Sequence, residues 1–213
     1  MRRENISGPL SGRRAQAARN DGLILDAARE VFTANPGAPI SAVAERAGVG
    51  ISALYRRYES KEDLLRHLSG EGLGRYIAVA EGALADEGDP WEAFAGFMRR
   101  AVDADTHSLT LSLAGTFTPT EELNRDGARA HDLTQRLLER TKAAGTLRAG
   151  IEVGDLSLIF EQLAAIKVGD RQRTGQLRHR YLTLILEALH DASAEPLPGP
   201  PPEWEEIRRR WDA

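Results

Sequence analysis

The chain has 213 residues, of which 41% are hydrophobic, 28% charged and 6% aromatic, a composition within the range of globular proteins. It contains no cysteine, which excludes disulfide bonds, thiolate metal sites and cysteine nucleophiles. The polar N-terminus lacks a secretory signal, and no run of about 18 apolar residues is present. The sequence therefore predicts a cytoplasmic protein without a membrane span.

The formal net charge of −4 is unevenly distributed along the chain. Residues 1–67 carry 11 Lys and Arg against 8 Asp and Glu, whereas the remainder carries 17 against 24. The first 20 residues contain five Arg, among them Arg13 and Arg14, and a single Glu. This composition predicts a flexible basic arm that contacts phosphate groups, and the alternative is a solubilising tail.

Three helices are expected near the N-terminus. Apolar residues at helical spacing predict the first helix over residues 21–34. Pro39 then opens a short helix that ends at Gly48, because its fixed φ suits a first helical turn. A second short helix follows over residues 51–58, and the small Gly48 allows the two helix backbones to approach each other.

The rest of the chain is also expected to be helical, since no alternating strand pattern is sustained. Ser60 and Asp89 are expected N-caps of two helices, and Gly145 is expected to end another. The sequence thus predicts an all-α protein. Its predicted parts are an arm at 1–20, a helix-turn-helix domain at 21–66, a helical regulatory and dimerisation domain at 67–192, and a Pro-rich linker and tail at 193–213.

The stretch that follows the predicted first helix resembles the DNA-binding domain of the TetR family. The resemblance rests on the apolar first helix, the Ala47–Gly50 turn, the Leu54-Tyr55 pair, Tyr58 and Lys61. It implies a three-helix helix-turn-helix domain joined to a C-terminal helical domain that binds a small molecule and forms the dimer. Many members of the family have Ser or Thr where this chain has Pro39, and Ser41 is the nearest substitute.

A helix-turn-helix places the N-terminal half of its second helix in the major groove of DNA. Ser52 and Arg56 are expected to read base edges, although Arg56 could equally clamp a phosphate. The resemblance assigns Tyr55 and Lys61 to phosphate groups, and a solvated surface lysine is the alternative for Lys61. The residues predicted to contact DNA are Arg13, Arg14, Ser41, Gly50, Ile51, Ser52, Ala53, Tyr55, Arg56, Arg57 and Lys61.

The resemblance also implies a binding site for a small, apolar effector in the C-terminal domain. The residues expected to line it are large and mostly apolar, and the alternative is that they form ordinary core. They are Tyr76, Phe94, Met98, Phe117 and Leu137.

The last two predicted helices, at residues 154–168 and 175–189, have apolar stripes wider than one face. Such helices need partners on more than one side, which predicts a four-helix interface with a second copy, unless both are ordinary core helices. The predicted interface residues are Leu156, Ile159, Phe160, Leu163, Tyr181, Leu182, Ile185, Leu186 and Leu189.

No catalytic, metal or cofactor site is predicted. Asp103, Asp105 and His107 have metal-binding side chains, but alternate positions of a helix point in different directions. The glycines at 70–74 lack the spacing of a nucleotide-binding loop.

The sequence therefore predicts a dimeric regulator that binds double-stranded operator DNA, acting as a repressor that an effector releases. The alternative is a helix-turn-helix adapter that contacts only proteins. A ligand-modifying helical enzyme would need an acid and base pair, which the sequence does not reveal.

Overall fold

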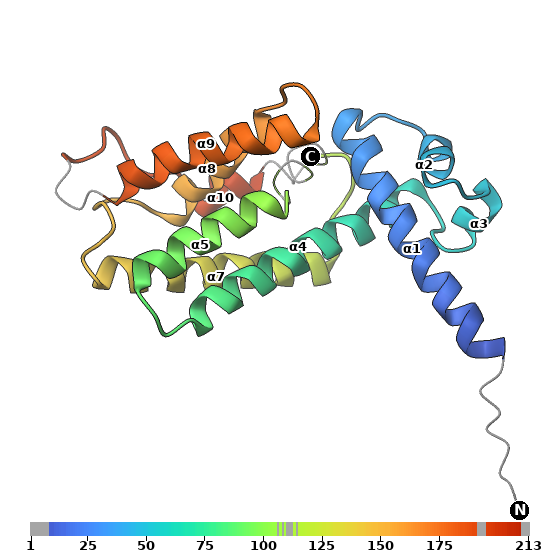
Figure 1. Ribbon diagram of the computed structural model, residues 1–213, viewed down its shortest axis with the longest axis horizontal. Helices are drawn as coiled ribbons and strands as arrows, with labels where there is room; N and C mark the ends of the chain where they lie inside the picture. The colour runs from blue at the N-terminus through green and yellow to red at the C-terminus, as the bar shows by residue number, and fades with distance from the viewer. Residues whose placement is uncertain are drawn as a thin grey trace, which may run out of the picture. The chain divides into compact units, whose positions relative to one another are not determined.

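The computed structural model describes residues 9–105, 107, 109, 113, 115–190 and 195–209, with only the backbone described for 9–19 and 208. All regular secondary structure in this part of the chain is helical, which confirms the all-α prediction (Figure 1). The chain divides into two compact units, Met1–Leu68 (unit 1) and Ser69–Ala213 (unit 2).

Unit 1 contains α1 (Pro9–Ala34), α2 (Ile40–Ala47), α3 (Ile51–Tyr55) and the first turns of α4 (Lys61–Ala85). Helix α1 begins twelve residues before the predicted start at position 21, so residues 9–20 of the predicted flexible arm are helical. The apolar spacing marks the part of α1 that contains the buried Ile24, Ala28 and Phe32. Residues 9–20 include three Ala and three Arg, which have high intrinsic helix propensity.

The core of unit 1 is formed by buried side chains from α1, α2, α3 and the start of α4. Phe32 of α1 and Leu54 of α3 have no exposed surface, and Tyr58, which follows α3, is 2% exposed. The predicted cap of α4 is confirmed, since Ser60 Oγ accepts a hydrogen bond from the Asp63 amide at 3.0 Å. Because Leu54 within α3 and Tyr58 just after it are buried in this core, the orientation of α3 within the unit is fixed, and so is the position of its outer face.

In the part of the chain that the structure describes, unit 2 contains the rest of α4 and the five helices labelled α5 and α7 to α10 in Figure 1. The predicted N-cap Asp89 accepts a hydrogen bond from the Glu92 amide at 2.9 Å, and the predicted helix end at Gly145 has φ +71°. Both predictions are confirmed. The helices are α5 (Pro90–Asp103), α7 (Glu121–Ala143), α8 (Val153–Ala165), α9 (Arg171–Leu189) and α10 (Trp204–Arg208).

The C-terminal segment, residues 195–209, lies against unit 2. The centre of the Trp204 ring is 4.4 Å from the centre of the His131 ring, so this tryptophan contacts α7. The Pro202 carbonyl oxygen is so close to α8 that a β-carbon on Gly154 would stand only 2.3 Å from it. Glycine at position 154 therefore permits this contact.

Candidate nucleic-acid interface

Helix α2 ends in a turn at Gly48, whose backbone adopts the left-handed conformation. Gly48 has φ +66°, and its amide donates to the Glu45 carbonyl at 3.1 Å. The Val49 amide donates to the Ala44 carbonyl at 3.0 Å, which completes the two-bond pattern of a glycine-terminated helix. A β-carbon at Gly48 would meet no heavy atom within 4 Å, so the glycine is needed for its positive φ and not, as expected, for close approach of the helices.

Helix α3 buries one side and exposes the other. Leu54 faces the core, whereas Ile51 is 40% exposed and Tyr55 49% exposed. Ser52 is also exposed, and Ala53 is half-buried. The structure therefore brings together on one surface the residues that the sequence assigned to the major groove, with small side chains at its N-terminal end.

Arg56 and Arg57 follow α3 and are both exposed, but their surroundings differ. Arg57 forms an ion pair with Asp21 of α1, with Nη2 at 2.8 Å from Oδ2. Arg56 forms no ion pair with any residue in the described part of the chain. An exposed ion pair is worth at most about 1 kcal/mol, so Arg57 can exchange Asp21 for a phosphate at small cost.

Lys61 lies at the start of α4 but its ammonium group is directed into unit 1. Its Nζ donates to the Pro36 carbonyl oxygen at 2.9 Å and lies 5.1 Å from the centre of the Phe32 ring. This lysine therefore ties α4 to the α1–α2 turn. Its contact with a phosphate group stays a prediction.

The remaining predicted DNA contacts lie near the helix starts. Ser41, in the first turn of α2, and Gly50, which precedes α3, are exposed. Pro39 is the N-cap of α2, one residue before the first helical position expected for it. The side chains of Arg13 and Arg14 lie outside the described residues.

Unit 2 contains a small, partly open cavity between α5, α8 and α9, and its empty volume of about 190 Å³ includes open solvent. None of the five residues predicted to bind an effector lines it. Phe94, Met98 and Leu137 have no exposed surface and form core, and Phe117 is 8% exposed. Tyr76 is nearest to the cavity, because its ring contacts the rings of His107 and Phe160 edge-on. The residues that line the cavity are Ala101, Val102, Asp105, His107, Phe160, Leu163, Ala164 and Arg178.

Tyr76 and His107 bring polar groups into this apolar region. The Tyr76 hydroxyl is hydrogen-bonded to Thr134 Oγ1 at 2.9 Å, and burial raises the pKa of Tyr76 to about 12 despite that bond. Burial lowers the pKa of His107 to about 4, and its ring stacks on Phe160 with centres 4.5 Å apart. Both side chains are therefore uncharged at neutral pH.

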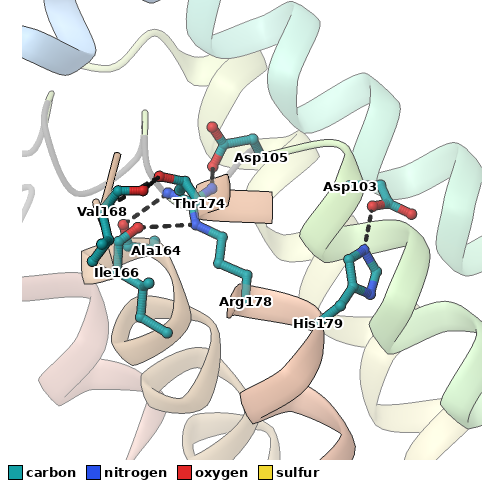
Figure 2. A network of polar contacts seen from close by, with 8 residues as sticks. All are labelled: Asp103, Asp105, Ala164, Ile166, Val168, Thr174, Arg178 and His179. Atoms are coloured by element: carbon teal, nitrogen blue, oxygen red, sulfur yellow. Dashed lines mark hydrogen bonds and ion pairs between the residues drawn. The ribbon is translucent and has the colours of Figure 1, made fainter. Parts of the chain in front are cut away.

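The three residues considered for metal binding have separate partners. Asp103 pairs with His179, Oδ1 to Nε2 at 2.6 Å, and Asp105 pairs with Arg178, Oδ1 to Nη1 at 2.6 Å (Figure 2). His107 instead stacks on Phe160. The sequence did not reveal the pairing of Asp105 with Arg178, because 73 positions separate them.

The predicted dimer residues are distributed between core and surface. Six of the nine are buried within a single chain, since α5 and α7 already cover them: Leu156, Phe160, Leu163, Leu182, Leu186 and Leu189. They are not available as a free face. Tyr181 is exposed, and Ile159 and Ile185 are half-buried. Of the predicted dimer interface, only these three residues and their exposed neighbours on α9 remain candidates for contact with a second copy.

No helix among the described residues is both long and apolar enough to cross a membrane.

Two family models match separate parts of the chain. Residues 24–68 match the model described as bacterial regulatory proteins, tetR family, which covers α2, α3 and most of unit 1. Residues 89–191 match the model described as the SbtR-like transcriptional regulator C-terminal domain, which covers most of unit 2.

Whole-chain comparisons agree with the family models. The HTH-type transcriptional repressor LfrR of Mycolicibacterium smegmatis is 27% identical over 182 residues, covering 84% of this chain and 91% of the relative. The crystal structure of a TetR transcription regulatory protein from Mycobacterium vanbaalenii has 28% identity and a TM-score of 0.55, covering 85% of this chain and 99% of that one. The structure of LfrR from Mycobacterium smegmatis in complex with proflavine has 24% identity and a TM-score of 0.60, covering 84% and 99%.

Proposed function

This chain belongs to the TetR family of bacterial transcriptional regulators, and from that membership we propose that it is a homodimeric repressor of a pseudo-palindromic operator. In this proposal a small molecule that binds unit 2 weakens the operator complex. The same proposal assigns the reading of DNA to the outer face of α3 and the residues that follow it.

The exposed outer face of α3 is the observation on which the proposal depends. Leu54 and Tyr58 hold the helix from inside, and Ile51, Ser52 and Tyr55 project from the opposite side. A monomeric domain gains nothing in stability from exposed Ile and Tyr side chains, whereas thymine methyl groups and phosphates are partners for them. Ser52 and Arg56 are assigned to base edges, and Tyr55 and Arg57 to phosphates.

The surface of α9 supports dimerisation. Tyr181 and Leu184 are 48% and 54% exposed, and Leu177, Ile185 and Ala188 continue the same face at helical spacing. Pairing two copies through this face, with Ile159 of α8 beside it, buries apolar surface that one copy exposes. A two-fold dimer would present its recognition helices about 34 to 36 Å apart, one turn of duplex.

Release by an effector rests on the two-unit organisation and on the relatives. LfrR has been solved in complex with proflavine, so that relative holds a small molecule. In this chain, unit 2 contains the cavity between α5, α8 and α9. A coupling free energy of about 1 to 3 kcal/mol between the two binding events would lower operator affinity about 5- to 150-fold.

The full-length protein can be tested by selecting bound duplexes from a random pool. An inverted repeat is expected, because a two-fold dimer contacts two equivalent half-sites. Arg56→Ala should weaken binding to the selected duplex or relax its preference at one position of each half-site. Arg99→Ala is the matched control, since Arg99 is an exposed arginine of α5 in unit 2.

Two outcomes would contradict the proposal. If the pool yields no enriched sequence, the chain does not recognise a specific operator. This result would favour the adapter alternative, in which α3 contacts a protein. An enriched sequence without internal symmetry, bound by one copy of the chain, would remove the dimeric arrangement.

A further inference from the structure

Helix α4 begins with a lysine whose ammonium group is held inside unit 1. Lys61 Nζ donates to the Pro36 carbonyl oxygen at 2.9 Å and lies over the Phe32 ring, 5.1 Å from its centre. Phe32 itself has no exposed surface. A charge-assisted hydrogen bond and a cation over an aromatic face both stabilise this position. Contact between this ammonium group and a phosphate would require both interactions to be broken.

The carbonyl that Lys61 binds belongs to a turn with its own internal bonds. The Gly37 amide donates to the Asn35 side chain at 3.0 Å, and the Ala38 amide donates to the Asn35 carbonyl at 3.0 Å. These bonds set the shape of the turn, whereas the Lys61 bond fixes the turn relative to the start of α4. Because α2 begins two residues after Ala38, a fixed turn also fixes the start of α2.

The first turn of α4 is already capped by its own side chains. Ser60 Oγ accepts a hydrogen bond from the Asp63 amide at 3.0 Å, and Asp63 Oδ2 accepts one from the Glu59 amide at 3.1 Å. An amide that a phosphate at this helix start would need is therefore occupied. The Asp63 carboxylate beside it would also repel the phosphate. The start of α4 is thus poorly suited to hold the DNA backbone.

Arg57 differs from Lys61 in its surroundings. Its side chain is 58% exposed and its partner is the Asp21 carboxylate, whereas Lys61 is half-buried and its partner is a backbone carbonyl. A phosphate can replace the carboxylate at Arg57 with one anion exchanged for another, and an exposed ion pair contributes little to stability. Arg57 is therefore the cation available to DNA, and Lys61 is the one retained within the unit.

We propose that Lys61 is a positioning residue for DNA binding, which fastens the α1–α2 turn to α4 and thereby places α2 and α3 without touching DNA itself. A second link acts in the same direction: the Tyr58 ring, just after α3, contacts the His67 ring of α4 with centres 5.3 Å apart. Loss of the Lys61 bond would leave α2 free to shift relative to α4, and α3 with it. This role rests on the proposed function, because it is a role in operator binding.

The first experiment measures the duplex affinity of full-length Lys61→Met over a range of salt concentrations. Methionine keeps an unbranched apolar side chain over Phe32 but lacks the charge and the donor. Affinity for the selected duplex should fall about tenfold, the equivalent of one charge-assisted hydrogen bond, at a temperature where circular dichroism shows the variant folded. The slope of affinity against salt should stay unchanged, whereas Arg57→Ala should reduce it by about one. Lys167→Met, an exposed lysine of unit 2, is the matched control and should bind as the unchanged chain does.

The second experiment uses the unchanged chain, which contains three lysines: Lys61, Lys142 and Lys167. Acetic anhydride labelling followed by mass spectrometry gives the reaction rate of each one. Lys61 should react several-fold more slowly than the exposed Lys167, because its ammonium group is hydrogen-bonded and half-buried. Addition of the selected duplex should leave the rate at Lys61 unchanged, whereas a lysine that contacts a phosphate would be protected.

Three results would contradict this role of Lys61. They are a salt slope reduced in Lys61→Met as in Arg57→Ala, an affinity of folded Lys61→Met equal to that of the unchanged chain, and slower labelling of Lys61 in the presence of the duplex. If Lys61→Met fails to fold, the labelling comparison still decides between holding and contact. Failure of the proposed function is distinguishable, because no duplex would then be selected, although slow labelling of Lys61 in the free chain would still show its bond to the turn.

Discussion

Apolar side chains are usually buried and charged ones exposed, and each unit contains an exception of a different kind. Unit 1 leaves Ile51 and Tyr55 exposed on α3, whereas unit 2 takes the charged Arg178 out of solvent. Each departure is held in place by local contacts: Leu54 lies beneath α3, and the Ala164 carbonyl accepts a bond from Arg178. In unit 1, therefore, the buried side chains that hold α3 are not the exposed ones proposed to contact DNA, whereas in unit 2 the buried charged group is itself the one that the backbone holds.

The largest effect is expected from a pair of substitutions within α3. Leu54→Ala should lower the free energy of unfolding by about 2 to 5 kcal/mol, because it leaves a cavity in the core. Ile51→Ala, on the exposed side, should change it by less than about 0.5 kcal/mol and yet weaken duplex binding. Urea denaturation and duplex titration measure the two effects. If Ile51→Ala destabilised the fold as much as Leu54→Ala, α3 would not separate residues that stabilise unit 1 from residues that contact DNA.

A second pair compares glycines of the two units. Gly154→Ala should destabilise unit 2 by about 1 to 3 kcal/mol, because its β-carbon would stand 2.3 Å from the Pro202 carbonyl oxygen. Gly50→Ala should change stability by less than about 0.5 kcal/mol, since its β-carbon would meet nothing within 4 Å. Thermal unfolding of both variants tests this difference, and equal destabilisation would show that the C-terminal segment does not press on α8.

A smaller effect is expected from pH, through His107. Its pKa is about 4 in the folded chain against 6.5 for a free histidine. Above pH 6.5 the imidazole is neutral in both states and contributes nothing to pH dependence. As the pH falls from 6.5 towards 4, the unfolded chain takes up a proton that the folded chain does not. The free energy of unfolding should then fall by at most about 1.4 kcal/mol per pH unit.

The matched variant for this effect is His107→Gln, which removes the titrating group. Urea unfolding of both chains between pH 8 and pH 5 should give parallel profiles above pH 6.5 and diverging profiles below it, with the steeper fall in the unchanged chain. Parallel profiles over the whole range would show that His107 is not shielded from protons in the folded state.

The site in unit 1 could be predicted from the sequence because its parts are close along the chain. Gly48, Leu54 and Tyr58 stand within eleven positions, and their spacing alone specifies a turn and a helix with one buried side. The exposure of Ile51 and Tyr55 agrees with that pattern. The inward direction of Lys61 could not be predicted, because its partner is the Pro36 carbonyl, a backbone atom on the other side of α2 in sequence.

The site in unit 2 could not be predicted in the same way. The helix start at Asp89 follows from a local capping signal, and the structure contains this cap. The pairing of Arg178 with Asp105 depends on how α5, α8 and α9 pack, which no local spacing encodes. The wide apolar stripes of α8 and α9 predict an interface with a second copy, but most of those residues pack inside a single chain.

Whether the outer face of α3 binds operator DNA can be tested through the salt dependence of duplex affinity. For the selected duplex, the logarithm of the binding constant should fall linearly with the logarithm of salt concentration, by roughly 0.9 for each phosphate neutralised. Arg57→Ala should reduce this slope by about one. Affinity that is independent of salt, or a slope unchanged in Arg57→Ala and an affinity unchanged in Ile51→Ala, would contradict DNA binding by this face.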